Sequence, residues 1–533
     1  MANYLVFLPE TILVVVGFAS IVLGFAWGKK PAYLWALALA GTLAALVITL
    51  DMMGLGLTTL LGLQLWPSPI GTQGDFTSDL KLKVDAFALL FHLVFLLIAF
   101  LAILASRGFI HADEPHQGEY YGLMLLAVVG MMFTAAAMDL FVLFLAFETS
   151  SMSTFALVAF RKKDKESTEA AVKFFIIGAI SSAIILFGIS LVYGVAGSTA
   201  IGPTLDLTKL QYGLNVAVIP GMEPPLIVAL VLLVAGFGFK AAVVPFHMWA
   251  PDVYQGSPTT ISTFLAAGSK MVGVVALIKV FLTGLLSVQV DWVVAISVLA
   301  IATMTLGNVL AIPQRSVKRM LAYSSIAQVG YILIALPVGA VAINARTGNP
   351  TVSLATIAAA TTVATAALLG ALFHVFTYAA MKGGAFLVVA GTQSRGIADD
   401  MDAYRGLSRR MPFMALAMTI FLLSLAGIPP LGGFFSKFFL FSSAVSAMTF
   451  SPWYVVLAIA GVLNSALSVY YYARVIWYMY ILEPEGDVAK MTAPRSISAG
   501  VLVALAIVLL TGVLAFWIYN YLFIAAQSFF GFM

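Results

Sequence analysis

Cysteine is absent from the sequence, and charged residues are scarce. The chain has 533 residues, of which 9% are charged and 62% are hydrophobic. Without cysteine it can form no disulfide, no thiolate metal site and no cysteine-ligated iron–sulfur cluster. Soluble domains usually carry about 25% charged residues. The composition therefore excludes a soluble enzyme and predicts one polytopic membrane domain.

Motifs for nucleotides and metals are missing as well. No Walker-type or dinucleotide-binding glycine pattern occurs. The five histidines are not arranged as paired haem ligands on two helices, and carboxylates within the apolar segments are too few for a dedicated calcium site. The net charge of +4 does not indicate a nucleic-acid partner, because basic residues in membrane proteins report the orientation of loops. We expect no cofactor, metal or nucleic acid to be bound by this chain.

Long apolar runs dominate what is present. About 20 apolar residues cross a bilayer as a helix, whereas a barrel strand alternates over about ten residues. We therefore predict an all-α polytopic membrane protein with about 14 transmembrane helices, the first one retained because no cleavage site follows it. The segments are 4–26, 33–50, 86–105, 121–138, 140–160, 170–194, 225–244, 260–284, 291–312, 320–341, 354–393, 413–447, 454–479 and 497–523.

Basic residues are distributed unevenly between the loops. Sixteen Lys and Arg residues follow odd-numbered segments, whereas even-numbered segments are followed only by Lys81, Lys83, Lys209 and Arg346. Basic loops face the cytoplasm in membrane proteins. We therefore predict that both termini lie on the opposite side of the membrane.

Proline and glycine interrupt three segments. The seventh runs into Pro245, the twelfth contains Pro429 and Pro430, and the eleventh, 354–393, has a double glycine beginning at Gly383. Proline breaks or kinks helices, and broken helices at membrane depth line protected paths, so we expect all three segments to be interrupted. Because segments seven and twelve are five helices apart, we predict inverted five-helix repeats with broken helices 7 and 12.

This pattern divides the chain into four parts. Residues 1–110 form an N-terminal three-helix segment, and residues 111–285 form the first repeat, helices 4–8. Residues 286–480 form the second repeat, helices 9–13, and residues 481–533 form the C-terminal helix.

Four ionisable side chains lie within apolar segments: Glu148, Lys240, Lys270 and Lys437. A charge near the bilayer centre costs at least about 2.5–3.5 kcal/mol, so each is a candidate functional residue. The alternatives are a protonated structural glutamate and lysines that reach the headgroups. Hydropathy alone leaves Lys240 near the end of its segment. Burial disfavours the charged form of both residue types and a nearby opposite charge favours it, so a Glu–Lys set can change protonation as a proton relay must.

A second group comprises Lys173, His374 and Lys382. Lys173 lies a few residues into its segment and is equally explained by a side chain that reaches the headgroups, while His374 is also compatible with a hydrogen-bonded core histidine. Lys279 and Arg474 lie near segment ends, and we expect both to extend to the membrane surface.

Four stretches of the sequence resemble a known family. They are residues 167–175, 240–258 (KAAVVPFHMWAPDVYQGSP), 316–326 (SVKRMLAYSSI) and 426–430, which leads to Lys437. They are similar to the antiporter-like membrane subunits of respiratory complex I, the proton-pumping NADH:quinone oxidoreductase, and most similar to subunit N (subunit 2 in mitochondria). The similarity extends from about residue 120 to 480.

The resemblance implies roles for the candidate residues. It places Glu148 as the fifth-helix glutamate, Lys240 as its seventh-helix partner at mid-membrane, Lys270 as the eighth-helix connecting lysine and Lys437 as the twelfth-helix terminal residue. It places Lys173, His374 and Lys382 as relay or tuning positions on a central polar axis.

The resemblance also implies partners and location. NADH, flavin, iron–sulfur clusters and quinone would bind to partner subunits, and the neighbours would be other complex I membrane subunits, including antiporter-like ones, together with lipids. The fourteen segments favour a multi-pass protein of the bacterial cytoplasmic membrane with periplasmic termini. Two alternatives stay open: a stand-alone cation/proton antiporter or membrane-hydrogenase subunit, and a passive membrane scaffold.

Overall fold

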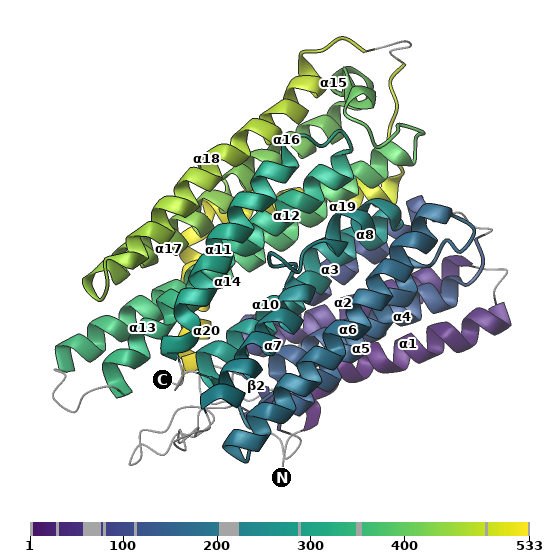
Figure 1. Ribbon diagram of the computed structural model, residues 1–533. Helices are drawn as coiled ribbons and strands as arrows, with labels where there is room; N and C mark the ends of the chain where they lie inside the picture. Colours follow the sequence, from purple (N-terminus) through teal and green to yellow (C-terminus); the bar gives the residue numbers. More distant parts are fainter. Residues whose placement is uncertain are drawn as a thin grey trace.

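The computed structural model describes residues 4–27, 31–56, 76–77, 81–110, 114–201, 223–285, 289–347, 354–484 and 489–530. Within these ranges the protein is an elongated bundle of helices with one two-stranded antiparallel sheet (Figure 1), formed by β1 (Phe76–Thr77) and β2 (Lys83–Val84).

The first half contains η1 (Tyr4–Phe7), α1 (Leu8–Trp27), α2 (Pro31–Leu50), η2 (Asp51–Leu55), α3 (Ala86–Phe109), α4 (Gln117–Ala136), α5 (Leu140–Val158), α6 (Lys165–Ala196), α7 (Glu223–Ala241), α8 (Trp249–Gly256), α9 (Thr259–Phe264), η4 (Leu265–Ser269), α10 (Lys270–Lys279) and η5 (Val280–Gly284). The second half contains α11 (Gln289–Ala311), α12 (Val317–Leu333), α13 (Ala335–Thr347), α14 (Leu354–Gln393), η7 (Asp402–Tyr404), α15 (Leu407–Arg410), α16 (Pro412–Ala426), α17 (Gly432–Ser446), η8 (Ala447–Thr449), α18 (Trp453–Tyr480), α19 (Arg495–Val513) and α20 (Ala515–Phe530).

The membrane-spanning architecture is confirmed. Among the described residues, thirteen helical segments are long and apolar enough to cross a membrane, and the broken pair α16 and α17 supplies a further crossing. Continuous helices satisfy their own backbone hydrogen bonds in lipid, which is why apolar runs of this length fold in this way. The spans Thr259–Gly284 and Val317–Val341 are buried within the protein, so they form its centre.

The seventh and twelfth segments are broken, as predicted. Helix α7 ends at Ala241, and Ala242 adopts a left-handed conformation with φ +57° before the chain reaches Pro245. Helix α16 ends at Ala426, Gly427 caps it with φ +89°, and α17 starts after the proline pair. A Cβ atom at Gly433 would lie 1.8 Å from the Ser424 carbonyl oxygen, so glycine is required where the two half-helices approach each other.

The expected interruption of the eleventh segment is wrong, because α14 is one continuous helix of 40 residues. Without proline, glycine costs a helix only about 1 kcal/mol and does not remove a hydrogen-bond donor. The glycines instead permit close packing: a Cβ atom at Gly384 would lie 2.3 Å from the Phe421 ring of α16, and one at Gly370 would lie 2.7 Å from the Leu440 amide nitrogen of α17.

The order of helix contacts recurs in the two halves. Helix α4 packs along α5 and α10, and α7 packs against α6 and α10. In the same order, α11 packs along α12 and α18, and the broken pair α16–α17 packs against α14 and α18. Each half therefore places its broken helix between two continuous ones.

The two ends of the bundle differ in composition. The N and C termini and β2 lie at one end (Figure 1), which we name the terminal end. Helix α15, with Arg409 and Arg410, lies at the opposite end, which we name the basic end. The arrangement of the termini agrees with an even number of crossings.

Candidate functional site

Glu148 and Lys240 lie on neighbouring helices near the break of α7. The Lys240 ammonium is buried and donates to the hydroxyls of Ser151 (3.2 Å) and Thr154 (3.4 Å), both on α5. Glu148 accepts a hydrogen bond of 2.6 Å from Ser182 on α6 and interacts with Lys240 through space. The burial of Lys240 excludes the alternative that it reaches the headgroups.

Aromatic rings surround Lys240. The rings of Phe147, Phe155 and Phe174 lie with their centroids 5.7–5.9 Å from its Nζ. Such contacts stabilise a cation that has lost its water. The last turn of α7 is held in place by Trp249, whose indole donates to the Phe239 carbonyl at 2.8 Å. Because Trp249 holds the last turn of α7, Lys240 stays in a fixed position although it lies next to the end of the helix.

Lys270 and Lys382 are joined by two adjacent serines of α12. Lys270 Nζ donates to Ser325 Oγ at 2.8 Å, and Lys382 Nζ donates to Ser324 Oγ at 2.7 Å. Both lysines are buried. Ser324 also contacts the Tyr472 hydroxyl of α18, so the polar line continues toward the second half.

Lys437 and His374 lie at the break of the twelfth segment. Lys437 Nζ donates to the carbonyl oxygens of Leu425 (2.8 Å) and Ala426 (3.1 Å) at the C-terminus of α16, and to Ser465 Oγ at 2.9 Å. The carbonyl end of a helix favours a cation. His374 Nδ1 lies 3.0 Å from Ser436 Oγ on α17, so the ring is next to the lysine-bearing turn.

The partners of the central lysines are hydroxyl and carbonyl oxygens, and no carboxylate lies within ion-pair distance of them in the described parts of the chain. A hydroxyl accepts a hydrogen bond from a charged ammonium and can donate one to the lone pair of a neutral amine. Serine and threonine therefore accommodate both protonation states of lysine, whereas a direct carboxylate partner would favour only the charged state.

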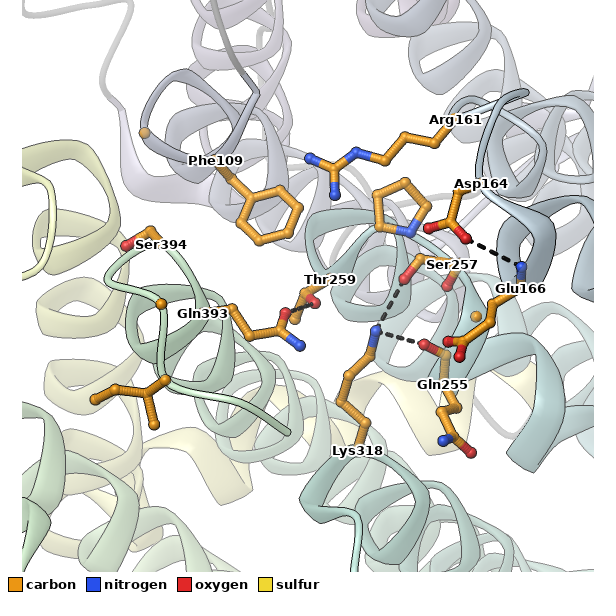
Figure 2. A pocket seen from close by; sticks show the side chains of 15 residues that line it. Phe109, Arg161, Asp164, Glu166, Gln255, Ser257, Thr259, Lys318, Gln393 and Ser394 are labelled. Carbon is orange, nitrogen blue, oxygen red and sulfur yellow. Dashed lines mark hydrogen bonds between the residues drawn. The ribbon is translucent and has the colours of Figure 1, made fainter. Parts of the chain in front are cut away.

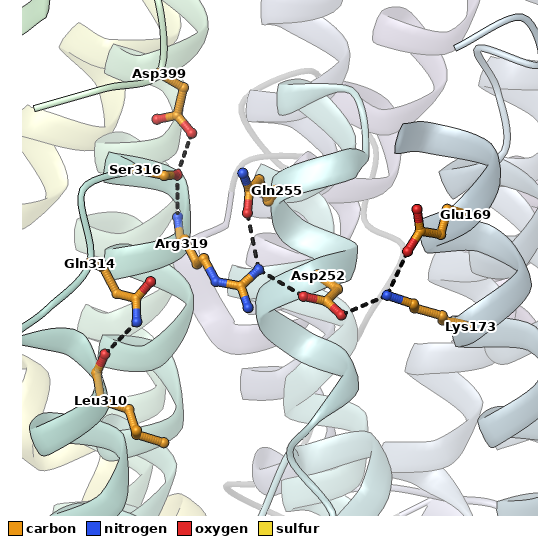
Figure 3. Close-up of polar contacts among 9 residues, drawn as sticks. All are labelled: Glu169, Lys173, Asp252, Gln255, Leu310, Gln314, Ser316, Arg319 and Asp399. Atoms are coloured by element: carbon orange, nitrogen blue, oxygen red, sulfur yellow. Dashed lines mark hydrogen bonds and ion pairs between the residues drawn. The ribbon is translucent and has the colours of Figure 1, made fainter. Parts of the chain in front are cut away.

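Lys173 does not join this line, and the expected central position is not met. Its side chain is 44% exposed at the basic end and pairs with Glu169 (2.7 Å) and Asp252 (3.0 Å). Asp252 also pairs with Arg319 of α12 at 2.7 Å (Figure 3). Burial opposes ionisation of Asp252, but the hydrogen bonds from Arg319 and Lys173 outweigh it and hold the pKa of this carboxyl below its usual value. The network connects α6, α8 and α12.

A polar cavity of about 420 Å³ opens at the basic end beside this network. Arg161, Asp164 and Glu166 line one side, and Gln393 at the end of α14 lines the other (Figure 2). Lys318 lies at its base and donates to the carbonyl oxygens of residues 255 and 257 at 2.8 and 2.9 Å. Side chains of both charge signs make this cavity suitable for water.

The structure shows the contacts of Arg474 and Lys279, the two residues that we expected to extend to the membrane surface. Arg474 donates to the carbonyl oxygens of Ile312 and Gln314, both at 2.6 Å, and so completes the C-terminus of α11. Lys279 is not a surface lysine, so that expectation is wrong: it is buried, and its Nζ donates to the Ala135 carbonyl at 2.5 Å. Hydropathy cannot distinguish the end of an apolar segment that faces protein from one that faces lipid.

Several residues of the site were not assigned a role from sequence. Ser324 and Ser325 belong to the SVKRMLAYSSI stretch, and Asp252 belongs to PDVYQGSP, but their contacts connect residues about 55–80 positions apart. The two motifs thus meet through the Asp252–Arg319 ion pair. Within the described residues, no group of three or more His, Cys, Asp or Glu side chains is placed to hold a metal ion.

Comparisons with known proteins agree with this geometry. Residues 137–347 and 351–468 match a family model described as NADH:quinone oxidoreductase/Mrp antiporter, TM. The chain is 43% identical over 515 residues to F(420)H(2) dehydrogenase subunit N of Methanosarcina mazei, covering 95% of this chain and 94% of that protein. It is 38% identical over 501 residues to NADH-quinone oxidoreductase subunit N of Trichlorobacter lovleyi, covering 93% and 92%.

Solved structures show the same fold. A chain of respiratory complex I from Thermus thermophilus with bound Aureothin aligns with a TM-score of 0.73 and 30% identity, covering 96% of this chain and 98% of that one. A chain of the Mrp complex from Dietzia sp. DQ12-45-1b aligns with a TM-score of 0.78 at 18% identity, covering 98% of both chains, which is a likeness of fold alone.

The broken helices and the buried lysine line define a polytopic membrane subunit of the antiporter-like class. The chain belongs to the NADH:quinone oxidoreductase/Mrp antiporter transmembrane family. The two relatives reported above are named as subunit N of an F(420)H(2) dehydrogenase and of an NADH-quinone oxidoreductase.

Proposed function

We propose that this chain is a proton-translocating subunit in the membrane arm of a complex I-type oxidoreductase. One observation supports this above all: buried lysines on four different spans form a line, and each of them donates to a serine or threonine hydroxyl, which tolerates both protonation states of lysine. A stand-alone antiporter for sodium would need membrane-depth carboxylates or a carbonyl cage, and Glu148 is the only carboxylate next to the central lysines in the described residues.

The relay runs through the centre of the molecule. A proton bound at Lys240 shares the field of Glu148, and loss of that proton leaves a neutral amine that Ser151 can hydrogen-bond. Lys270, Lys382 and Lys437 then exchange protons in turn, with Ser324, Ser325, Tyr472 and intervening water as carriers. Each step breaks one N–H or O–H bond and forms one N–H or O–H bond, so no electron moves within this chain. His374, whose ring contacts Ser436 beside Lys437 on α17, is placed to tune this lysine.

The driving redox chemistry belongs to partner subunits in this proposal. NADH, flavin, iron–sulfur clusters and quinone would be bound there, which fits a chain without cysteine. The sequence is equally compatible with F420H2 as the electron donor of the complex. The relative at 43% identity is a subunit of an F(420)H(2) dehydrogenase, and the one at 38% is a subunit of an NADH-quinone oxidoreductase. The donor is a property of the partner that binds it, so both donors belong in the assay.

Neighbouring antiporter-like membrane subunits are the proposed partners. An apolar groove of about 650 Å³ runs between α17 and α18 and is lined by Lys437, Phe438 and Val462. A relay residue beside an apolar groove suits contact with another membrane subunit or with lipid. The proposed location is the bacterial cytoplasmic membrane, with the basic end in the cytoplasm and both termini in the periplasm, because basic loops face the cytoplasm.

We also propose that residues 111–285 and 286–480 are inverted repeats between an N-terminal unit, 1–110, and a C-terminal unit, 481–533. The recurring order of helix contacts and the break in the fourth helix of each unit support this division.

The test replaces Lys240 or Lys437 by methionine, which keeps the length of the side chain and removes the titratable amine. We expect proton translocation to fall by about tenfold or more, because a positioned proton-transfer group usually contributes at least that much. Translocation is measured in membrane vesicles with NADH and F420H2 as alternative donors, and assembly is followed by native gel electrophoresis.

Lys163→Met is the matched control, because Lys163 is exposed in the loop before α6. Unchanged translocation in both relay variants at normal assembly would support the passive scaffold instead. A chain that migrates without any dehydrogenase activity would support the stand-alone antiporter.

A further inference from the structure

A buried acid and a buried histidine face each other outside the central line. Glu10 of α1 and His92 of α3 are each 1% exposed, and Glu10 Oε1 lies 3.4 Å from His92 Nδ1. Both carboxylate oxygens and Nδ1 lack a hydrogen-bond partner among the described residues. An unsatisfied buried carboxylate is costly, so this arrangement calls for a proton between the two groups.

The histidine is oriented for that role by the backbone. Its Nε2 lies 3.1 Å from the Met132 carbonyl oxygen of α4. A carbonyl oxygen can only accept, so Nε2 carries the hydrogen and, in the neutral ring, Nδ1 presents its lone pair to Glu10. The separation of 3.4 Å is long for a hydrogen bond, and a small side-chain rotation closes it.

Further charged groups lie beside this pair at the terminal end. Asp85 caps α3 two turns before His92 and pairs with Lys83 at 3.1 Å. Lys279, the buried lysine of α10, interacts through space with both Asp85 and His92. Asp51, which is buried, directly follows α2 in η2, and η2 packs against α3. Of the helices packed against α1, α2 itself has no charged residue, and the acid of α4, Glu119, lies in its first turn at the opposite end.

The position of Lys279 connects this cluster with the central line. Lys279 lies on the same span as Lys270, Thr259–Gly284, and π-helical turns, Leu265–Ser269 and Val280–Gly284, flank α10 on both sides. Short π-helical turns occur frequently at functional sites. Lys279 Nζ donates to the Ala135 carbonyl of α4, one turn from the Met132 carbonyl that His92 contacts, so α4 links this span with the pair.

We propose that Glu10 and His92 form a second proton-binding site, which exchanges protons between the central lysine line and the surface at the terminal end. One proton is held between the two side chains, either as a carboxylic acid beside a neutral ring or as a carboxylate beside an imidazolium. Transfer from Glu10 to His92 breaks one O–H bond and forms one N–H bond, and release to water at the terminal end leaves the carboxylate. The exchange with the lysine line rests on the proposed function, whereas proton binding by the pair does not.

Infrared difference spectroscopy of the purified complex tests proton binding. Between acid and alkaline pH, the wild-type protein is expected to show a protonated-carboxyl band from Glu10. The band is lost in Glu10→Gln and shifts in His92→Gln, which keeps the acid and changes its partner. Glu148→Gln identifies the contribution of the carboxyl group beside the central lysines. If the carboxyl region of the infrared difference spectrum is unchanged in Glu10→Gln, the proposal is wrong.

The chain offers a matched control pair. His116 and Glu119 contact each other at 2.9 Å on the surface, with side chains 54% and 31% exposed, so Glu119→Gln should leave the band in place. If Glu10→Gln does not assemble, His92→Gln decides: an unshifted band overturns the proposal.

Translocation measured in the same Glu10→Gln complex tests the exchange. Loss of translocation with electron transfer retained supports it, and unchanged translocation overturns it. Failure of the proposed function has a separate signature, because Lys240→Met would then leave translocation unchanged while the Glu10 band persists.

Discussion

The central line and the network at the basic end both use lysine, but they pair it differently. Lys270 and Lys382 hydrogen-bond serine hydroxyls inside the protein, whereas Lys173 pairs with the carboxylates of Glu169 and Asp252 near the surface. A carboxylate fixes the charge of its partner, and a hydroxyl accepts either state. The comparison indicates that the partner, and not the lysine itself, separates a proton carrier from a structural ion pair.

The largest effect on proton translocation should come from replacing the hydroxyl partner of a central lysine by a carboxylate. Ser325→Asp places a carboxylate where Ser325 Oγ now lies, 2.8 Å from Lys270 Nζ. A hydrogen bond to a charged group is worth about 1.5–3 kcal/mol, so the charged lysine should release its proton roughly ten- to a hundredfold more slowly. Proton translocation in vesicles measures the effect.

Ser325→Asn is the control for Ser325→Asp, because it has the same shape without the charge. Equal translocation in the two variants would mean that the volume of the side chain, and not its charge, disturbs Lys270.

A smaller effect is expected from breaking the network at the basic end. Asp252→Asn removes the acceptor of two ion pairs, and since Asp252 is partly exposed the free energy of unfolding should fall by about 1 kcal/mol. Translocation per assembled complex should change little. Thermal unfolding in detergent measures the loss, and a collapse of translocation at normal stability would place Asp252 in the relay.

The same residue predicts a pH dependence. The pKa of Asp252 is lowered in the folded protein by Arg319 and Lys173 despite burial, so its contribution is present above the ordinary aspartate pKa, about 3.9, and is lost as pH falls through the folded value. The stability difference between wild type and Asp252→Asn should therefore vanish in acid.

The smallest effect is expected for Lys173→Met. This side chain is 44% exposed, and Arg319 still pairs with Asp252 in its absence. Translocation and the unfolding midpoint should both match the wild type within error. A loss of translocation as large as that of Lys240→Met would return Lys173 to the proton path and remove the distinction between the two regions.

Particular elements show why some features could be predicted and others could not. The breaks at Pro245 and Pro429 were predictable because proline removes a donor locally. The continuity of α14 was not, because Gly384 is there to admit the Phe421 ring of a different helix. The burial of Lys279 was missed for the same reason, since its partner is the carbonyl of Ala135, 144 positions away.

The sequence by itself determined the membrane class, the number of crossings and the broken seventh and twelfth helices, because these follow from apolar length and from backbone chemistry within a few residues. Only the tertiary structure decided which ionisable groups meet: it aligned Lys270 and Lys382 on adjacent serines, moved Lys173 to an exposed ion pair and brought Glu10 to His92. The physical reason is that the protonation of a buried group depends on the atoms within a few ångströms of it, and in a helical bundle those atoms come from distant parts of the chain.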